Sequence, residues 1–182
     1  MGPFLANIFM ADCALSKRFL QPIFNFGIRI YVAFIFFKSG LTKVDENFQV
    51  TQSTKDLFAN DFKVPYLPSD LAATLASYAE LILPVLLVLG LFTRPAALGL
   101  FIVNTVAAYT LAQTDFASAI GTWQHIVWGL ILATVFVYGP SKTSIDSWFA
   151  DKWRDRETNL LIKLVNIIVL SAIGYYLLNK YL

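Results

Sequence analysis

Residues 71–113 read LAATLASYAELILPVLLVLGLFTRPAALGLFIVNTVAAYTLAQ, two apolar runs joined by a short turn. Within them only Glu80 and Arg94 carry a charge. A helix needs about 20 mostly apolar residues to cross the roughly 30 Å hydrocarbon core of a bilayer, and each run is long enough. Because the linker is so short, we expect a tight antiparallel hairpin of two membrane-spanning helices.

The rest of the chain continues this pattern. Hydrophobic residues make up 57% of the 182 residues and charged residues 14%, against roughly 25% charged residues in a soluble domain. These apolar runs lack the alternation of barrel strands, so each is expected to be helical. The predicted fold class is an all-α, polytopic membrane helix bundle whose five spans cover residues 24–42, 71–92, 95–113, 123–139 and 159–178.

We expect three regions along the chain. Residues 1–23 form an N-terminal tail or an interfacial helix, residues 24–149 form a four-helix membrane core, and residues 150–182 form an interfacial segment and a fifth transmembrane helix. In the loop after the first span, TKDLFANDF at 54–62 predicts a short amphipathic helix lying on the bundle.

Charge indicates the orientation and excludes some partners. A net charge of +2 and the absence of a basic run give no reason to expect a nucleic-acid partner, and the single cysteine, Cys13, cannot form an internal disulfide. Placing the N-terminus in the cytoplasm puts seven basic loop residues inside and four outside, which the positive-inside rule favours. We therefore expect a multi-pass membrane protein with a cytoplasmic N-terminus.

Glu80 is the polar residue hardest to reconcile with lipid. It lies nine residues into its run, about 14 Å from the outer end, and a short carboxylate cannot reach water from that depth. Pro84 lacks the N–H that would bond the Glu80 carbonyl, and Ala73 and Ser77 on the same face leave room for another helix. Glu80 is thus predicted inside the bundle, either in a structural ion pair or as a protonatable functional carboxylate.

Two cations on the first span could serve Glu80. Lys38 is near the outer end, where it either snorkels to the interface or faces Glu80, and we expect it to face Glu80. Arg29 is predicted on the opposite side of the helix, toward the inner end.

His125 and Asn104 complete the interior polar residues. His125, the only histidine, begins the fourth span at the level of Lys38, where it is either a polar end group or a residue that exchanges protons. Asn104, in the middle of the third span, is typical of an interhelical hydrogen bond. Lys38, Glu80 and His125 are the candidate catalytic residues.

Several chemistries are excluded by the residue inventory. One histidine cannot supply bis-histidine haem ligation, and no set of ligating residues has zinc or copper spacing, so neither haem nor zinc is expected. A Gly-rich phosphate loop and the common hydrolase motifs are also missing.

Three segments, RIYVAFIFFKSGLTK, AELILPVLLVLGLFTRPAAL and HIVWGLILATVFVYGPSKTSID, resemble in order the DoxX family of small bacterial inner-membrane proteins. The family pattern has an arginine and G-x-x-K around the first span, a glutamate before an LGL-x-TR turn, and a final G-P-G-x-x-S-x-D. The resemblance covers residues 24–149 and departs from the pattern at Ser141, where the family often has glycine. The matching positions are Arg29, Gly40, Lys43, Glu80, Gly90, Arg94, Gly139, Pro140, Ser144 and Asp146.

The resemblance adds Lys43 to the interior polar residues and, with Pro84, makes Gly90, Arg94, Gly139, Pro140, Ser144 and Asp146 structural candidates. The FFKSGLTK segment is similar to a subgroup found with copper-linked peptide-modification systems. One branch of the family resembles the membrane subunit of thiosulfate:quinone oxidoreductase, and others are linked to oxidative-stress or metal-handling complexes. By analogy we expect an accessory redox subunit with a quinone as ligand and a redox or metal-handling protein as partner.

Two alternatives stay open. One is a non-catalytic membrane scaffold or partner-binding protein whose charges are structural. The other is a small-solute or metal transporter, which the lack of an inverted repeat disfavours.

Overall fold

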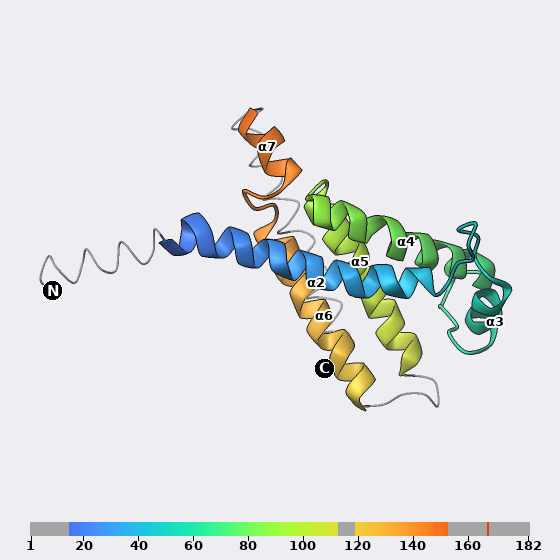
Figure 1. The fold of residues 1–182 in the computed structure, drawn as a ribbon. Coiled ribbons are helices and arrows are strands. Elements are labelled where there is room, and N and C mark those ends of the chain that lie inside the picture. Colours follow the sequence, from blue (N-terminus) through green and yellow to red (C-terminus); the bar gives the residue numbers. More distant parts are fainter. Residues whose placement is uncertain (1–14, 113–118, 153–166, 168–182) are drawn as a thin grey trace, which may run out of the picture. The chain divides into compact units, whose positions relative to one another are not determined.

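The structure is a computed structural model that describes residues 15–112, 119–152 and 167. By its contacts the chain divides into two units, Met1–Ser147 and Trp148–Leu182, and everything below concerns the first unit unless stated. The described elements are a π-helical turn, η1, at Ser16–Leu20, and the α-helices α2 at Gln21–Leu41, α3 at Gln52–Asn60, α4 at Ser69–Leu89, α5 at Thr93–Leu111, α6 at Ala119–Tyr138 and α7 at Ile145–Lys152 (Figure 1).

Four of the expected spans are confirmed. The helical stretches Ser16–Leu41, Ser69–Leu89, Thr93–Leu111 and Gly121–Tyr138 are each long and apolar enough to cross a membrane. The first begins at Ser16 rather than at residue 24, because basic side chains such as Lys17 can stay in a helix end while their charges reach the interface. The fifth expected span, at residues 159–178, lies outside the described residues apart from residue 167.

Small residues bring the long helices into contact. Helix α2 packs against α4, α4 against α5, and α5 against α6. A Cβ added at Gly40 would lie 3.0 Å from the Glu80 backbone, and one at Gly99 would lie 2.6 Å from the Leu83 side chain. These glycines therefore let the helices approach to the distances that van der Waals packing in a bilayer requires.

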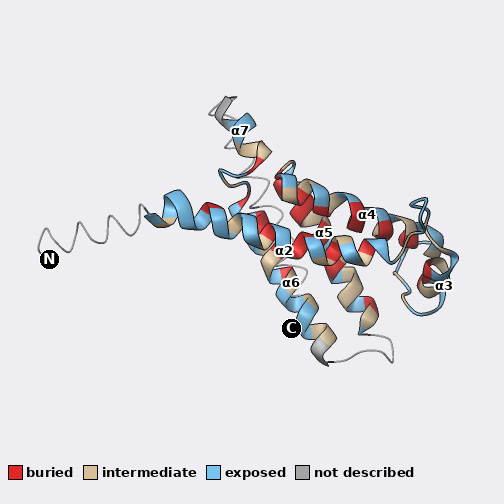
Figure 2. Cartoon of the chain, in the orientation of Figure 1, coloured by how far each residue is buried: buried red, intermediate tan, exposed pale blue. Residues whose placement is uncertain are grey.

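The outward faces of these helices are apolar and exposed (Figure 2). Phe34 on α2 is 66% exposed, Ile102 on α5 54% and Leu130 on α6 64%. Soluble monomers rarely expose apolar surface on this scale. The exposed faces fit contact with lipid, and the chain is an integral, multi-pass membrane protein.

Helix α3 is the amphipathic helix expected in the first loop. The Thr51 hydroxyl accepts a hydrogen bond from the Thr54 amide at 3.2 Å and so caps its N-terminus. Phe58 packs with Ala72 and Ala73 in a small buried cluster, which fixes α3 beside the N-terminal end of α4 (Figure 1).

Candidate functional site

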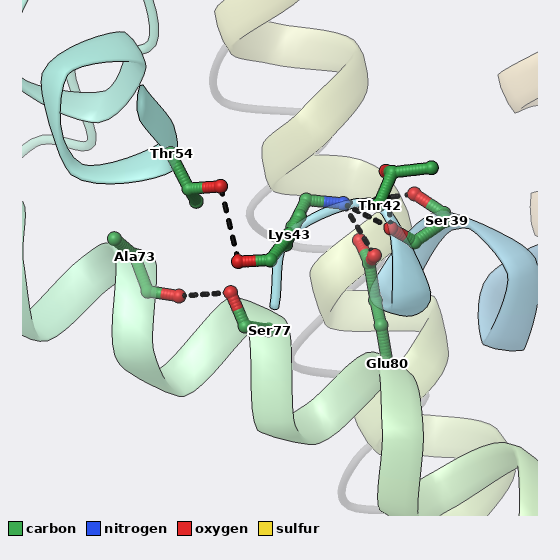
Figure 3. Close-up of polar contacts among 7 residues, drawn as sticks. All are labelled: Ser39, Thr42, Lys43, Thr54, Ala73, Ser77 and Glu80. Atoms are coloured by element: carbon green, nitrogen blue, oxygen red, sulfur yellow. Dashed lines mark hydrogen bonds and ion pairs between the residues drawn. The ribbon is translucent and has the colours of Figure 1, made fainter. Parts of the chain in front are cut away.

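Glu80 is held in an ion pair with Lys43. The Glu80 residue is 5% exposed, and its Oε2 lies 2.5 Å from Lys43 Nζ (Figure 3). The same ammonium donates to Ser39 Oγ at 2.8 Å and to the Ser39 carbonyl at 3.4 Å. The Lys43 side chain is 18% exposed and that of Glu80 is 7% exposed, so the pair is largely removed from solvent.

The turn after α2 explains why Lys43 reaches Glu80. The Lys43 amide donates to the Gly40 carbonyl at 3.0 Å. The Lys43 carbonyl accepts from Thr54 Oγ1 at 3.1 Å and from the Thr51 amide at 3.1 Å. These bonds fold the chain back over the last turn of α2. Because Gly40 has no side chain, the α4 backbone at Glu80 comes close enough for the pair to form.

The expected pairing of Lys38 with Glu80 is wrong. Lys38 is exposed near the end of α2, whereas Lys43 provides the cation. Depths along straight helix axes favoured Lys38, although the family resemblance had placed Lys43 among the interior polar residues. The turn after α2 folds back and brings Lys43, the later lysine, to Glu80.

Asn104 on α5 forms hydrogen bonds with His125 on α6 at two points. Its Nδ2 donates to the His125 carbonyl at 2.8 Å, which turns the amide Oδ1 toward the ring, and Oδ1 lies 2.9 Å from Nδ1. Since Oδ1 can only accept, this amide orientation assigns the proton of neutral His125 to Nδ1. Nε2 is then an acceptor, and no partner for it is found within the described part of the chain.

These groups line one cavity, which we call the Glu80 cavity. Its volume is about 840 Å³, and Lys38, Lys43, Glu80 and His125 all contribute to its wall. Most of the remaining lining is apolar and comes from α2 to α6, including the aromatic residues Phe34, Phe36, Phe58 and Trp128. The His125 and Trp128 rings meet edge to face at 5.1 Å. A cavity of this size, mostly apolar with a few convergent polar groups, is typical of a small-molecule site.

A second polar cluster surrounds Arg29, in the N-terminal half of α2. Arg29 is fully buried, and its Nη2 donates to Thr143 Oγ1 at 2.9 Å and to Ser141 Oγ at 3.4 Å. Its Nη1 donates to the Leu87 carbonyl at 3.4 Å. None of the described carboxylates forms an ion pair with Arg29, and its Nε is buried without a partner in the described structure.

Two glycines singled out in the sequence pack against arginines, Gly90 against Arg29 and Gly139 against Arg94. Gly90 ends α4 with a φ of +67°, and an added Cβ would lie 2.5 Å from Arg29 Nη1. Arg94 packs over Gly139, where φ is +73° and a Cβ would lie 2.5 Å from Arg94 Nε. Both positions need glycine because of the backbone angle and the lack of space.

Asp146 fastens the loop after α6 to the start of α5. Its carboxylate accepts from the Phe92 amide at 2.8 Å, and from the Thr93 amide and hydroxyl at 2.7 Å each. Its own amide donates to the Gly90 carbonyl at 2.9 Å. Ser144 is buried and donates to the Ser141 carbonyl at 2.6 Å, which shapes the same loop, while Pro140 is exposed.

Pro84 is buried within α4, one turn after Glu80.

Sequence reasoning missed several of these contacts. Ser141 and Thr143, the partners of Arg29, lie more than 110 residues from it along the chain. Trp128 is only one helical turn after His125, but it has no motif of its own. The hairpin of α5 and α6 could have suggested that Asn104 and His125 meet, because both were expected in neighbouring spans. Among the described residues, no group of three or more His, Cys, Asp or Glu side chains is placed to hold a metal ion.

Comparison with known proteins agrees with this architecture. The DoxX family model matches residues 24–113, and a model described as TQO small subunit DoxD matches residues 69–175. A protein of Haemophilus influenzae, described as uncharacterized, is 30% identical over 122 residues, which are 66% of this chain and 79% of that protein. No solved structure gives a significant match.

Proposed function

Because this chain belongs to the DoxX family of membrane proteins, we propose that it is an accessory redox subunit that binds a quinone in the Glu80 cavity. The observation that carries the proposal is this cavity, in which a histidine acceptor and a lysine–glutamate pair meet an aromatic wall. The match to the model described as TQO small subunit DoxD supports it, since that description accords with the resemblance to a thiosulfate:quinone oxidoreductase subunit.

The cavity fits the chemistry of a quinone. Its volume of about 840 Å³ is within the range of roughly 300–1,000 Å³ that small ligands occupy. The edge-to-face chain of Phe36, Trp128 and His125 offers apolar and π surface to a planar ring. Lysine ammonium groups can donate to quinone carbonyls, and the unpartnered His125 Nε2 can accept from a quinol hydroxyl.

In this proposal the chain supplies protons and position rather than electrons. Reduction of a quinone to a quinol takes up two electrons and two protons, and the electrons come from a redox partner protein. Asn104 holds the His125 ring so that Nε2 is the atom that exchanges protons. Nε2 would take up a proton from solvent and pass it to a reduced quinone oxygen, once for each of the two protons, and each transfer would return it to the acceptor form. The same arrangement would serve a complex that responds to oxidative or metal stress.

Trp128 provides a direct test, because quinones quench nearby tryptophan fluorescence. Purified full-length protein in mild detergent should show saturable quenching on titration with decylubiquinone. Trp128→Phe should remove most of the saturable signal, whereas Trp148→Phe, a change outside the cavity lining, should keep it. His125→Leu should weaken binding by about 2- to 10-fold, the effect of one lost hydrogen bond. Quenching that is not saturable, or that survives Trp128→Phe unchanged, would exclude this site.

One observation favours the alternative of a non-catalytic scaffold. Lys43 pairs with Glu80, and Asn104 bonds the carbonyl and Nδ1 of His125, so these polar groups could act only as links between helices. A protein that purifies without quinone, shows no saturable quenching and still captures a partner protein would support the scaffold.

A further inference from the structure

A second pocket lies at the opposite end of α2 from the Glu80 cavity. It has a volume of about 460 Å³ and is formed by η1, the start of α2, the end of α6 and the loop that follows. We call it the Lys17 pocket. Its polar lining consists of Lys17, Gln21, Asn25, Thr134, Ser141 and Lys142, and apolar side chains such as Phe24, Ile28 and Tyr138 complete it.

The charges around this pocket have one sign. Lys17 and Lys142 line it from two separate segments, and no acidic residue is found in its described lining. Behind the wall, the buried Arg29 donates to Ser141 Oγ, and Ser141 itself lines the pocket. The nearby Asp146 carboxylate offsets part of the Arg29 charge, so the positive potential in the pocket comes mainly from Lys17 and Lys142. The site is therefore suited to an anion.

Asn25 adds a requirement for a hydrogen-bond donor. Its Oδ1 is buried and has no hydrogen-bond partner among the described residues, although the side chain lines the pocket. A buried acceptor without a donor is unfavourable, so rotation of the Asn25 side chain toward the pocket, where a ligand hydroxyl could donate to Oδ1, would satisfy it. A fully ionised inorganic anion such as sulfate would leave this need unmet.

We propose that the Lys17 pocket binds the headgroup of an anionic phospholipid that carries a headgroup hydroxyl. The phosphate diester would lie between Lys17 and Lys142, and the hydroxyl would donate to Asn25 Oδ1. The pocket is at the end of two membrane-spanning helices, the depth at which phospholipid headgroups occur, and Phe24 and Tyr138 offer apolar contact to the start of the acyl chains. This site is separate from the Glu80 cavity and does not depend on quinone binding.

The test uses the full chain in detergent micelles doped with lipids of identical acyl chains. Phosphatidylglycerol should raise the midpoint of thermal unfolding and stay bound in native mass spectrometry, whereas phosphatidylcholine should do neither. Lys17→Gln/Lys142→Gln should weaken apparent phosphatidylglycerol binding by about ten-fold or more. Lys55→Gln/Lys63→Gln removes the same charge away from the pocket and should leave binding unchanged. If the first variant does not fold, Lys142→Gln alone, in an exposed loop, should still weaken binding.

Asn25→Leu tests the hydroxyl separately. Wild-type protein should prefer phosphatidylglycerol over phosphatidylmethanol, which has the phosphate diester but no hydroxyl, and Asn25→Leu should lose that preference while still preferring both over phosphatidylcholine. Equal stabilisation of wild-type protein by phosphatidylglycerol and phosphatidylcholine would overturn the proposal. Equal losses in the two double lysine variants would overturn it as well. Equal stabilisation by inorganic phosphate alone would show a site for a soluble anion instead of a lipid.

Discussion

Removal of one partner of the Lys43–Glu80 pair should destabilise the bundle strongly. At a separation of 2.5 Å and an effective dielectric constant of about 20, the Coulomb attraction is about 7 kcal/mol, and desolvation of the two ions offsets much of it. Breaking a buried pair leaves the other charge uncompensated, which typically costs about 3–5 kcal/mol. We expect Glu80→Gln and Lys43→Met each to lower the free energy of unfolding toward that range, with a smaller loss for Glu80→Gln because the lysine that it leaves unpaired is partly exposed.

The double variant shows whether the two residues act together. Glu80→Gln combined with Lys43→Met removes both charges, so its loss should be smaller than the sum of the single losses by about 1–3 kcal/mol. The free energies can be measured by reversible unfolding in mixed micelles with increasing SDS. Lys38→Met is the matched control, because it removes a lysine from the last turns of α2 that is exposed, and it should change stability by no more than about 0.5 kcal/mol.

Strict additivity of the Lys43 and Glu80 losses would refute this account of the pair. A coupling between Lys38 and Glu80 larger than that between Lys43 and Glu80 would restore the pairing first expected from helix depth. Either outcome would also remove the Lys43–Glu80 pair from the polar wall of the proposed quinone site.

Three further predictions concern the other end of the bundle and its orientation. Gly90→Ala should lower the free energy of unfolding by about 1–3 kcal/mol in the same SDS titration, because φ is +67° and a Cβ would lie 2.3 Å from a neighbouring side chain. Gly27→Ala, where nothing lies within 4 Å, should not lower it, and equal losses at the two glycines would contradict the packing. Asp146→Ala should lower the free energy of unfolding by about 1–2 kcal/mol, because α5 loses the cap at its N-terminus. Asp146→Asn keeps one acceptor and should lower it less. If Asp146→Ala were as stable as the unmodified chain, that result would argue against the cap. In a cysteine-free background, an impermeant maleimide added outside the cell should label Lys55→Cys and not Lys152→Cys; the opposite labelling would reverse the orientation.

The polar groups show the limits of sequence reasoning most clearly. Glu80 was expected inside the bundle because its depth is a property of its own helix, and the structure buries it. Its partner was not predictable in the same way, since Lys38 and Lys43 are similar in type and differ mainly in the path of the turn between them. Asn104 was expected to bond across helices, but its hold on both the ring and the carbonyl of His125 depends on how α5 and α6 are rotated.

The sequence by itself determined the class of protein and four of its spanning helices. Lipid offers no hydrogen-bond partners, so any segment that crosses it must be a helix of about 20 apolar residues, and this requirement can be read locally. Only the tertiary structure decided which distant groups meet. Asp146, for example, accepts a hydrogen bond from Thr93 at the start of α5, which lies more than 50 residues earlier in the chain. Such contacts depend on helix rotation, on the close approach that glycines allow and on the direction of each turn. None of these three is fixed by the local composition of a single segment.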